Sequence, residues 1–415
     1  MPSREQTPWL GKRRMPSLRH TLSMIGRTGP ATDRAARRLA AAHDIGDLRK
    51  LARQRAPRPV FDYIDGGAGD ETSLRRNFAS FNNVRLVPRV LRDVSTIDTS
   101  TTILDKPARL PVIIAPMGLA RMAHPAGEVA LARAAAAAGI PYTLSTMASF
   151  TLEDIATHAP AADRWFQLYL WRDRTASAAL IDRAWQAGFT TLALTVDCAV
   201  AGARHRDLRN GMTLPPSLPL RSTLQIAMRP RWWFDALTRE PLDFAMIHTP
   251  QESLAEQSAR LLDPSISVAD LDWLRQRWPG NLVVKGVMHP DDVVEVVNRG
   301  ADAVVISNHG GRQLELAAAP LDVLGEARAA VGETFPLFLD GGVRSGAHIA
   351  AAIAAGATAV LVGRAAMFGL MAGGEMGVRR SIDLLRTGLE RTMALLGAAT
   401  ISDLDASRIR LPGTR

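Results

Sequence analysis

The sequence predicts a (β/α)8 TIM barrel, an α/β fold in which eight parallel strands alternate with helices. Three observations lead to this prediction. Eight short apolar runs rich in β-branched residues recur along the chain, alanine-rich stretches with helical spacing lie between them, and the spacing is regular except at one place. Runs that are apolar throughout are typical of parallel strands buried on both faces. A doubly wound open sheet is the alternative, but no GxGxxG motif follows the first run.

The chain begins with a segment that lacks this pattern. Residues 1–42 are basic and rich in Pro, Ser, Thr and Arg, so we expect an extension that is poorly ordered or packs on the surface. The barrel domain is expected over residues 43–410. Its first helix starts near Asp44 and ends at prolines, and a second, in FDYIDGGAGDE, ends at glycines.

The eight strands are expected at the apolar runs, and helices such as GEVALARAAAAAG and RTASAALIDRAWQAG are expected between them. In chain order the runs are PVIIAP, PYTLST, WFQLYL, TLALTVD, LVVKGV, AVVISNHG, PLFLDGG and AVLVGR. Residues 198–280 separate the fourth run from the fifth, and we expect this insertion to be a lid, a binding loop or disordered. Within it, RPRWWFDAL could lie on a membrane or pack on the barrel.

Composition limits the class of protein. The 415 residues are 47% hydrophobic, enough for one large core or two ordinary ones. The single cysteine, Cys198, cannot form an intramolecular disulfide, and the N-terminus lacks an apolar stretch of signal-peptide length. A cytoplasmic protein is expected, with membrane contact that is at most peripheral. The net charge of +9 comes from arginines spread along the chain, which favours a solvated surface over nucleic-acid binding.

Polar residues close most of the eight runs. Enzymes with this fold place their sites on the loops after the strands, so these side chains are expected to meet at one end of the barrel. Each has an ordinary structural interpretation alone, such as a cap or an ion pair, but their joint placement favours an active site. They are Ser145, Gln167, Tyr169, Thr195, Asp197, Lys285, Ser307, His309, Asp340 and Arg364.

The last two runs suggest a phosphate site. DGGVRSG and VGRAA each place glycines and an arginine beyond a strand, where backbone N–H groups and a helix N-terminus favour an anion. Arg344 and Arg364 would supply charge. Either motif alone could be only a tight turn. Lys285 would then lie beside a phosphorylated cofactor such as a flavin, whose reduced ring is anionic, although a structural salt bridge is the alternative.

The loop after the sixth run predicts acid–base chemistry on a carboxylate. His309 is a candidate general base, and Asp197 could orient it and stabilise its protonated form. Arg312 could contact a carboxylate at two points, with Arg204 as a second cation. The substrate that fits these groups is a 2-hydroxy acid.

SNHGGRQL, LTVD, WFQLY, VVKG and DGGVRSG together resemble the FMN-dependent 2-hydroxy-acid dehydrogenase and oxidase family, from about Ile45 to Leu404. Within that family the chain is most similar to bacterial membrane-linked lactate and mandelate dehydrogenases, through FDYIDGGAGDE, WFQLYLWRDR, CAVAGARHRD and PRWWFD. The resemblance implies FMN as cofactor and an L-2-hydroxy acid, above all L-lactate, as substrate. It also implies electron transfer to quinone or another acceptor, attachment to the inner face of the membrane, and a homotetramer.

The resemblance assigns roles to individual residues. His309 becomes the base paired with Asp197, Tyr169 contacts the substrate oxygen, and the carboxylate lies on Arg312, Arg204 and Tyr63. No metal ligand is implied. The positions implied for FMN are Pro116, Met117, Gly118, Ser145, Gln167, Thr195, Lys285, Ser307, Asp340, Gly341, Gly342, Arg344, Gly363 and Arg364.

Three positions bear on the choice within the family. Met147 stands where glycolate oxidase has tryptophan, and Glu315 replaces the usual Asp of HGGRQLD. Gly118 matches several respiratory dehydrogenases, whereas glycolate oxidase carries alanine. An oxygen-using oxidase, a mandelate-type dehydrogenase, an FMN-dependent isomerase and a non-catalytic surface binder remain alternatives. The sequence leaves the preferred side chain, the acceptor, the oligomeric state and the role of residues 1–42 open.

Overall fold

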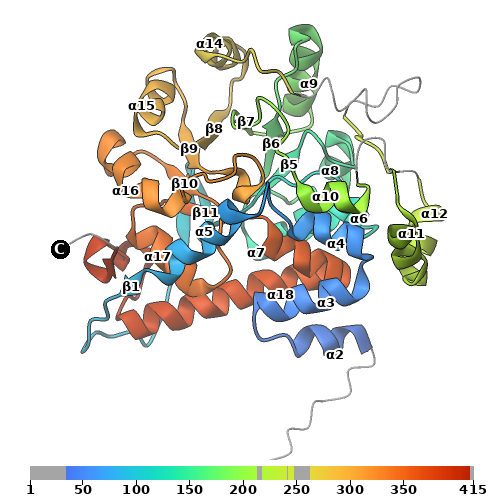
Figure 1. Cartoon of the computed structure of the whole chain (residues 1–415). Coiled ribbons are helices and arrows are strands. Elements are labelled where there is room, and N and C mark those ends of the chain that lie inside the picture. The colour runs from blue at the N-terminus through green and yellow to red at the C-terminus, as the bar shows by residue number, and fades with distance from the viewer. Residues whose placement is uncertain (1–33, 213–216, 241, 247–261, 412–415) are drawn as a thin grey trace, which may run out of the picture.

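A closed barrel of parallel strands forms the centre of the molecule (Figure 1). The computed structural model describes residues 34–212, 217–240, 242–246 and 262–411. The strand order around the barrel is β10-β11-β4-β5-β6-β7-β8-β9, which confirms the predicted fold. Its strands follow the eight apolar runs in order: β4 Val112–Ile114, β5 Tyr142–Ser145, β6 Arg164–Leu168, β7 Thr191–Thr195, β8 Asn281–Val287, β9 Ala303–Ile306, β10 Leu337–Leu339 and β11 Ala359–Val362.

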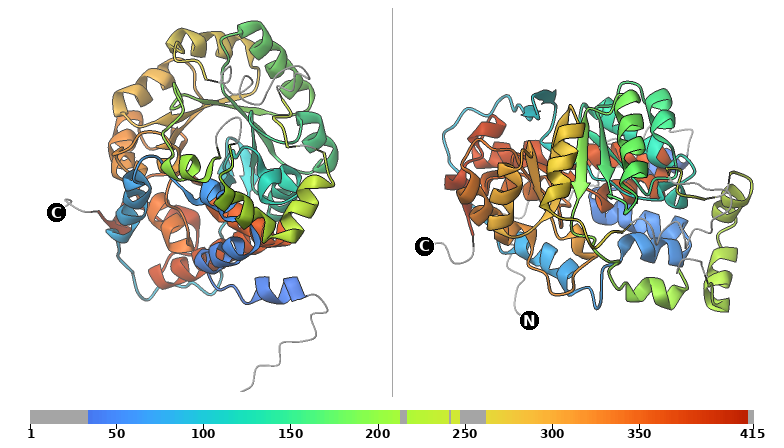
Figure 2. Two further views of the ribbon diagram at one scale, coloured as in Figure 1. Left: turned by 45° about the vertical axis from the view of Figure 1, so that its right-hand side comes forward. Right: turned by 90° about the horizontal axis from the view of Figure 1, so that it is seen from above.

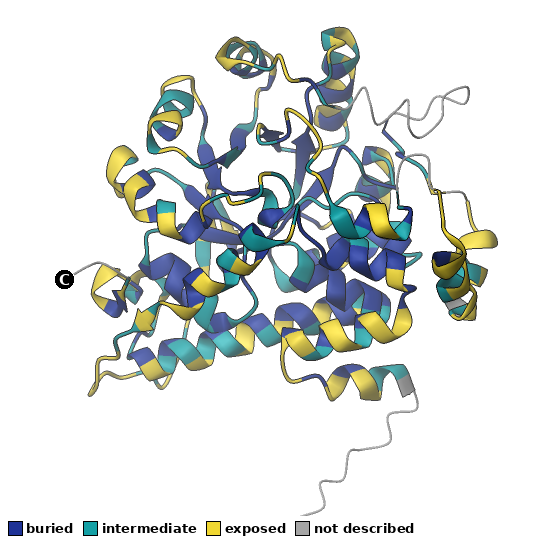
Figure 3. Cartoon of the chain, in the orientation of Figure 1, coloured by how far each residue is buried: buried dark blue, intermediate teal, exposed yellow. Residues whose placement is uncertain are grey.

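Helices surround the strands, as the left view of Figure 2 shows. Local sequence defines their ends: the Asp173 carboxylate caps α9 by accepting from the backbone N–H groups of Thr175 and Ala176. Because the helices cover the outer face of the sheet, the strands are buried on both sides (Figure 3). The surrounding helices are α6 Ala120–Ala123, α7 Gly127–Ala138, α8 Leu152–His158, α9 Arg174–Gln186, α14 Val268–Arg277, α15 Pro290–Asn298, α16 Pro320–Val331, α17 Gly346–Ala354 and α18 Arg364–Leu396.

A hairpin closes the amino-terminal end of the barrel. It consists of β2 Thr101–Ile103 and β3 Lys106–Ala108. Ile103 packs into an interior cluster with Trp165 and Phe338, and the Lys106 ammonium binds side chains that precede β6 and β7. The carboxyl ends of the strands therefore form the end of the barrel at which a site can open.

The segments outside the barrel repeat are α2 Arg34–Ala40, α3 Ile45–Arg55, α4 Arg58–Asp65, α5 Thr72–Asn82, β1 Arg85–Leu86, η2 Ile401–Asp403, η3 Ala406–Arg408 and β12 Ile409–Arg410, with β1 paired to β12. Of these, α2, α3 and α4 pack on α18, whereas α5 packs against α16 and the loop at His309–Gly311. Helix α2 falls within the expected extension, so ordered structure begins earlier than expected. Leu39 is buried and lies against Gly373, where α18 is broken, and this apolar contact was not visible in an arginine-rich stretch. Residues 1–33 lie outside the described residues.

The described residues between β7 and β8 contain three insertion helices and one barrel helix. The insertion helices are α10 His205–Asn210, α11 Leu220–Ala227 and α12 Pro230–Leu237. Helix α14, in contrast, is the crossover that every parallel strand pair requires, with Leu271 and Leu274 buried against the core. The expected insertion of residues 198–280 was therefore too long at its carboxyl end. Within the described residues, no helix combines the length and apolar character needed to cross a membrane.

Candidate active site

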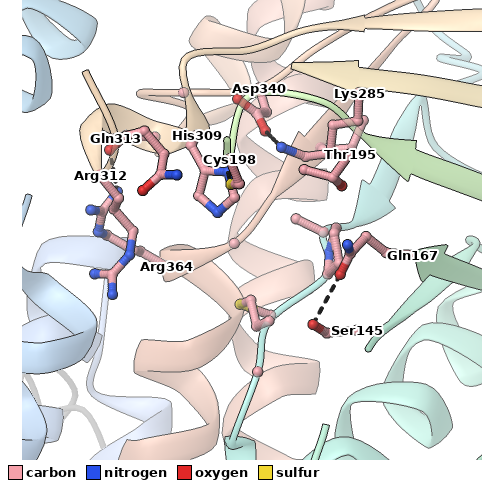
Figure 4. Close-up of a pocket in the computed structure, with 18 of the residues that line it drawn as sticks. Ser145, Gln167, Thr195, Cys198, Lys285, His309, Arg312, Gln313, Asp340 and Arg364 are labelled. Atoms are coloured by element: carbon pink, nitrogen blue, oxygen red, sulfur yellow. Dashed lines mark hydrogen bonds and ion pairs between the residues drawn. The ribbon is translucent and has the colours of Figure 1, made fainter. Parts of the chain in front are cut away.

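A cavity opens at the carboxyl ends of the barrel strands (Figure 4). Almost all of the expected site residues line it. Asp197 and Ser307 do not, and they lie directly behind His309 and Lys285. The expected residues on the cavity wall are Tyr63, Pro116, Met117, Gly118, Ser145, Gln167, Tyr169, Thr195, Arg204, Lys285, His309, Arg312, Asp340, Gly341, Gly342, Arg344, Gly363 and Arg364.

The loop that follows β9 holds His309 in an unusual backbone conformation. His309 has φ 58°, and its backbone N–H donates to the Ser307 hydroxyl at 3.0 Å. Gly310 and Gly311 follow with φ 62° and 73°, which suits glycine because it has no Cβ. At Gly311 an added Cβ would lie 2.5 Å from the backbone nitrogen of Leu74. The two glycines of the motif therefore let the loop turn tightly against α5.

His309 and Asp197 form a hydrogen-bonded pair. His309 Nδ1 lies 2.9 Å from Asp197 Oδ1, and both side chains are largely shielded from solvent. Burial acts to raise the pKa of Asp197, but the charge and hydrogen bond of His309 outweigh it and lower that pKa to about 2. Asp197 is thus a carboxylate at neutral pH. An added Cβ at Gly286 would lie 2.6 Å from Asp197 Cγ, so only glycine fits behind this carboxylate.

Two arginines converge on the ring of Tyr63. The guanidinium carbons of Arg312 and Arg204 lie 5.1 and 5.8 Å from the ring centre. Arg312 Nη1 donates to the carbonyls of Tyr63 and Gly66 at 2.7 and 3.0 Å, and Arg204 Nε donates to Asp207 at 2.7 Å. Burial and then the charge of Arg204 lower the pKa of Arg312. A small anion placed between the two guanidinium groups would relieve their mutual repulsion.

Lys285 is buried in an ion pair at the end of β8. Its ammonium lies 3.0 Å from Asp340 Oδ2 and donates to the Ser307 hydroxyl at 3.0 Å. Burial acts to lower the pKa of Lys285, but the charges of Asp340 and Asp197 outweigh it and raise that pKa. A fixed positive charge therefore lies on the cavity wall, and Figure 4 shows the ammonium directed at Asp340.

The loops after β10 and β11 form a positively charged end of the cavity. Gly341 and Gly342 have φ 86° and 91°. Burial, as the largest cause, lowers the pKa of Arg344 to about 10 and that of Arg364 to about 9. Among the described residues neither arginine forms an ion pair with a carboxylate; Arg364 binds the carbonyls of Ile64, Gly310 and Gly66. Two buried cations beside glycine turns suit a phosphate group.

The chain is similar to known proteins over most of its length. The family model for FMN-dependent dehydrogenase matches residues 52–411. A putative L-lactate dehydrogenase from Mycobacterium tuberculosis is 48% identical over 397 residues, 96% of each chain. An L-lactate oxidase from Nostoc is 42% identical over 89% of this chain and 98% of that protein. The crystal structure of a monotopic membrane protein, (S)-mandelate dehydrogenase, has a TM-score of 0.86 and 39% identity over 89% of this chain and 100% of that one.

The chain belongs to the FMN-dependent dehydrogenase family. It is therefore an FMN-dependent oxidoreductase that acts on 2-hydroxy acids. This confirms the resemblance and the cofactor that the sequence implied. The individual roles of the site residues stay predictions.

The cavity of this FMN-dependent dehydrogenase fits its cofactor. Among the described residues, the buried wall atoms Gln167 Nε2 and Thr195 Oγ1 have no hydrogen-bond partner, and a flavin ring offers partners for such atoms. Gln167 itself is fixed because its Oε1 accepts from the Ser145 hydroxyl at 3.0 Å. With the charged end at Arg344 and Arg364, the cavity provides polar groups for a ring and cations for a phosphate.

The three distinctive positions have structural explanations. An added Cβ at Gly118 would lie 2.8 Å from Met147 Cβ and 2.9 Å from the Met147 carbonyl oxygen, so a larger residue at 118 requires the chain at 147 to shift. Met147 is half-buried on the cavity wall. Glu315, for which the sequence offered no account, accepts from the backbone N–H of Thr72 at 2.9 Å and so caps the first turn of α5.

Sequence reasoning missed two polar residues on the cavity wall, Cys198 and Gln313. Gln313 ties the loops together, because its side chain binds the carbonyls of Asp197 and Val200 and accepts from the Gly202 N–H. Cys198 lies beside the base pair, and burial, followed by the charge of Asp197, raises the pKa of its thiol. Their positions directly after Asp197 and Arg312 were the only signal.

Proposed function

We propose that this enzyme oxidises L-lactate to pyruvate, with His309 as the base, and passes the electrons to a membrane quinone. One observation carries the proposal. His309, which is hydrogen-bonded to Asp197 behind it, and a two-arginine clamp face the same cavity as the cofactor groups. A 2-hydroxy acid presents a carboxylate and an adjacent hydroxyl, and these groups match the clamp and the base. The names of the putative M. tuberculosis lactate dehydrogenase and the Nostoc lactate oxidase support lactate.

The clamp orients the substrate before proton transfer. Arg312 and Arg204 bind the carboxylate, and both guanidinium groups lie against the ring of Tyr63. Arg312 is fixed by two backbone carbonyls, so little side-chain freedom is lost when the substrate binds. The substrate carbon is thereby presented to His309, and the Tyr169 hydroxyl lies beside its oxygen.

His309 then removes a proton. Its Nδ1–H donates to the Asp197 carboxylate, which leaves Nε2 to accept, as a proton, one of the two hydrogens that the substrate loses on oxidation. Asp197 stabilises the imidazolium that forms. When bound, FMN would supply the acceptor for the two electrons and for the second hydrogen. Lys285 would provide a positive charge for the negative charge that develops on the reduced ring.

Anaerobic bleaching of the flavin over a panel of hydroxy acids tests this function. L-lactate should bleach the yellow enzyme fastest, with pyruvate as product. Faster bleaching by (S)-mandelate would select the mandelate-type alternative. An FMN-dependent isomerase would show no bleaching by any hydroxy acid.

Arg312→Lys is expected to lower kcat/KM for L-lactate by about 10–10²-fold. Lysine keeps the charge but cannot contact the carboxylate at two points, which removes a charge-assisted hydrogen bond worth roughly 1.5–3 kcal/mol. Stopped-flow flavin reduction provides the measurement. Arg386→Lys, on an exposed face of α18, is the matched control and should leave the rate unchanged. Unchanged kinetics in Arg312→Lys would place the carboxylate elsewhere.

The insertion offers an exposed apolar face for a membrane. Leu220, Leu224 and Met228 recur every four residues along α11 and are 75%, 56% and 64% exposed. On α12, Phe234 and Leu237 are also exposed, and both helices lie at the edge of the molecule (Figures 1 and 3). Trp232 packs against the core and donates to the Met122 carbonyl, whereas Trp233 donates to the Ala227 carbonyl of α11. The monotopic mandelate dehydrogenase supports attachment of this kind.

Leu220→Glu with Leu224→Glu is expected to weaken binding to anionic vesicles by at least about tenfold. Each buried leucine contributes roughly 1.5–3 kcal/mol to such association. Co-sedimentation with the vesicles at low and high salt measures the binding. Leu395→Glu, at a residue of α18 with similar exposure, is the control. Two results would favour a soluble oxidase: wild-type protein that does not bind the vesicles, or peroxide formation from lactate as fast as reduction of a quinone analogue.

The assembly is proposed to be a homotetramer. Its mass in solution, measured by light scattering in detergent, tests this point independently of activity.

A further inference from the structure

Three side chains that can each bind a metal ion meet at the candidate base. They are Asp197, Cys198 and His309, and their ligand atoms all lie within 4.8 Å of one another. Cys198 Sγ lies 3.2 Å from Asp197 Oδ1 and 3.4 Å from His309 Nδ1, and His309 Nδ1 lies 2.9 Å from Asp197 Oδ1. Asp197 Oδ2 is buried and has no hydrogen-bond partner in the part of the chain that the structure describes. Thiolate, imidazole and carboxylate form a ligand set that suits zinc and related ions.

The three distances fit one face of a coordination tetrahedron. With zinc bonds of about 2.3 Å to sulfur and about 2.0–2.2 Å to nitrogen and oxygen, the edges of a regular tetrahedron are about 3.4–3.6 Å. The observed separations of 3.2, 3.4 and 2.9 Å are shorter by a few tenths of an ångström. Small side-chain rotations would open the triangle to the required size. Cys198 lines the cavity, so an ion can reach the site and take its fourth ligand from water there.

We propose that Cys198, His309 and Asp197 form an inhibitory site for zinc, cadmium and similar thiophilic divalent cations. The ion replaces the proton on His309 Nδ1, and that proton moves to Nε2. The thiol proton of Cys198 leaves to solvent. An imidazole with metal on Nδ1 and hydrogen on Nε2 has no lone pair for the substrate's proton, so the base is switched off while FMN stays bound. The site is distinct from a metal cofactor, which the sequence does not predict.

A thiolate-to-cadmium charge-transfer band tests binding without any assay of activity. Cys198 is the single cysteine of the chain, so a band in the FMN-loaded enzyme can arise only from its sulfur. Titration with cadmium chloride should give a saturable ultraviolet band, and Cys198→Ser should abolish it. His309→Gln should weaken the cadmium affinity by at least about tenfold, because it removes a ligand. Absence of a saturable band in the wild type overturns the proposal.

Inhibition of anaerobic flavin bleaching tests the consequence. Zinc should slow bleaching of the wild type by L-lactate, and the inhibitory concentration should rise at least about 100-fold in Cys198→Ala and Cys198→Ser, each compared with its own rate without metal. Magnesium, which prefers oxygen ligands, is the control and should have no effect. Unchanged zinc sensitivity in both variants overturns the proposal. This second test rests on the proposed function, whereas the charge-transfer band does not, so failure of one is distinguishable from failure of the other.

Discussion

His309→Gln is expected to retain FMN and to lose flavin reduction by about 10²–10⁴-fold, the usual contribution of a general base. Glutamine preserves a side chain of similar length and can still donate to Asp197, so the loop after β9 should keep its shape. The glutamine side chain cannot accept a proton near neutral pH. The loss should therefore appear in kcat, and KM for L-lactate should change little because Arg312 and Arg204 remain.

Stopped-flow reduction under anaerobic conditions measures this loss, and flavin absorbance after gel filtration measures cofactor retention. His158→Gln is the matched control, because His158 is exposed on α8 and contacts only its own helix. Near-normal flavin reduction in His309→Gln would rule out His309 as the base.

Lys285→Met is expected to destabilise the protein and to prevent FMN binding. The ammonium and the Asp340 carboxylate are 5% and 10% exposed, so removing one partner leaves an uncompensated charge in the barrel. Breaking a buried pair in this way costs roughly 3–5 kcal/mol. Thermal unfolding and flavin content give the two measurements.

A matched control and a double variant separate stability from cofactor binding. Lys106→Met breaks a half-exposed pair with Asp163 and should cost no more than about 1 kcal/mol. Lys285→Met with Asp340→Leu should recover much of the lost stability, because no buried charge is left alone, but should still lack FMN. Full FMN occupancy in the double variant would contradict a role of Lys285 beside the ring.

The barrel and most of its site were predictable because one physical pattern encodes both. Strands that are buried on both faces must be apolar throughout, so the eight apolar runs indicated the positions of β4 to β11 directly. The polar residue that ends each run then lies at the carboxyl end of its strand, whatever the connecting loops do. Thr195, Lys285 and Asp340 were found in this way.

The remaining parts depend on contacts that no local pattern reveals. Tyr63 could not be assigned a role from sequence patterns without the family resemblance. Its position beside the two arginines depends on the packing of α3 and α4 against α18, which is distant in the sequence. Cys198 is adjacent to a predicted residue, but the side on which its thiol falls is decided by the turn after β7. Helix α2 was missed because a single buried leucine fixes it.

The hydrogen bonds of Arg364 have a consequence for the order of events during biosynthesis. Its guanidinium binds the carbonyls of Ile64 and Gly66, which are 300 and 298 residues earlier in the chain. Helix α4 therefore leaves the ribosome long before the residue that holds its carboxyl end is translated. Contacts of such high sequence separation form slowly. During synthesis, α4 must therefore avoid non-native contacts until Arg364, which follows β11, has been translated. FMN can bind only at the end of synthesis or after the chain is released.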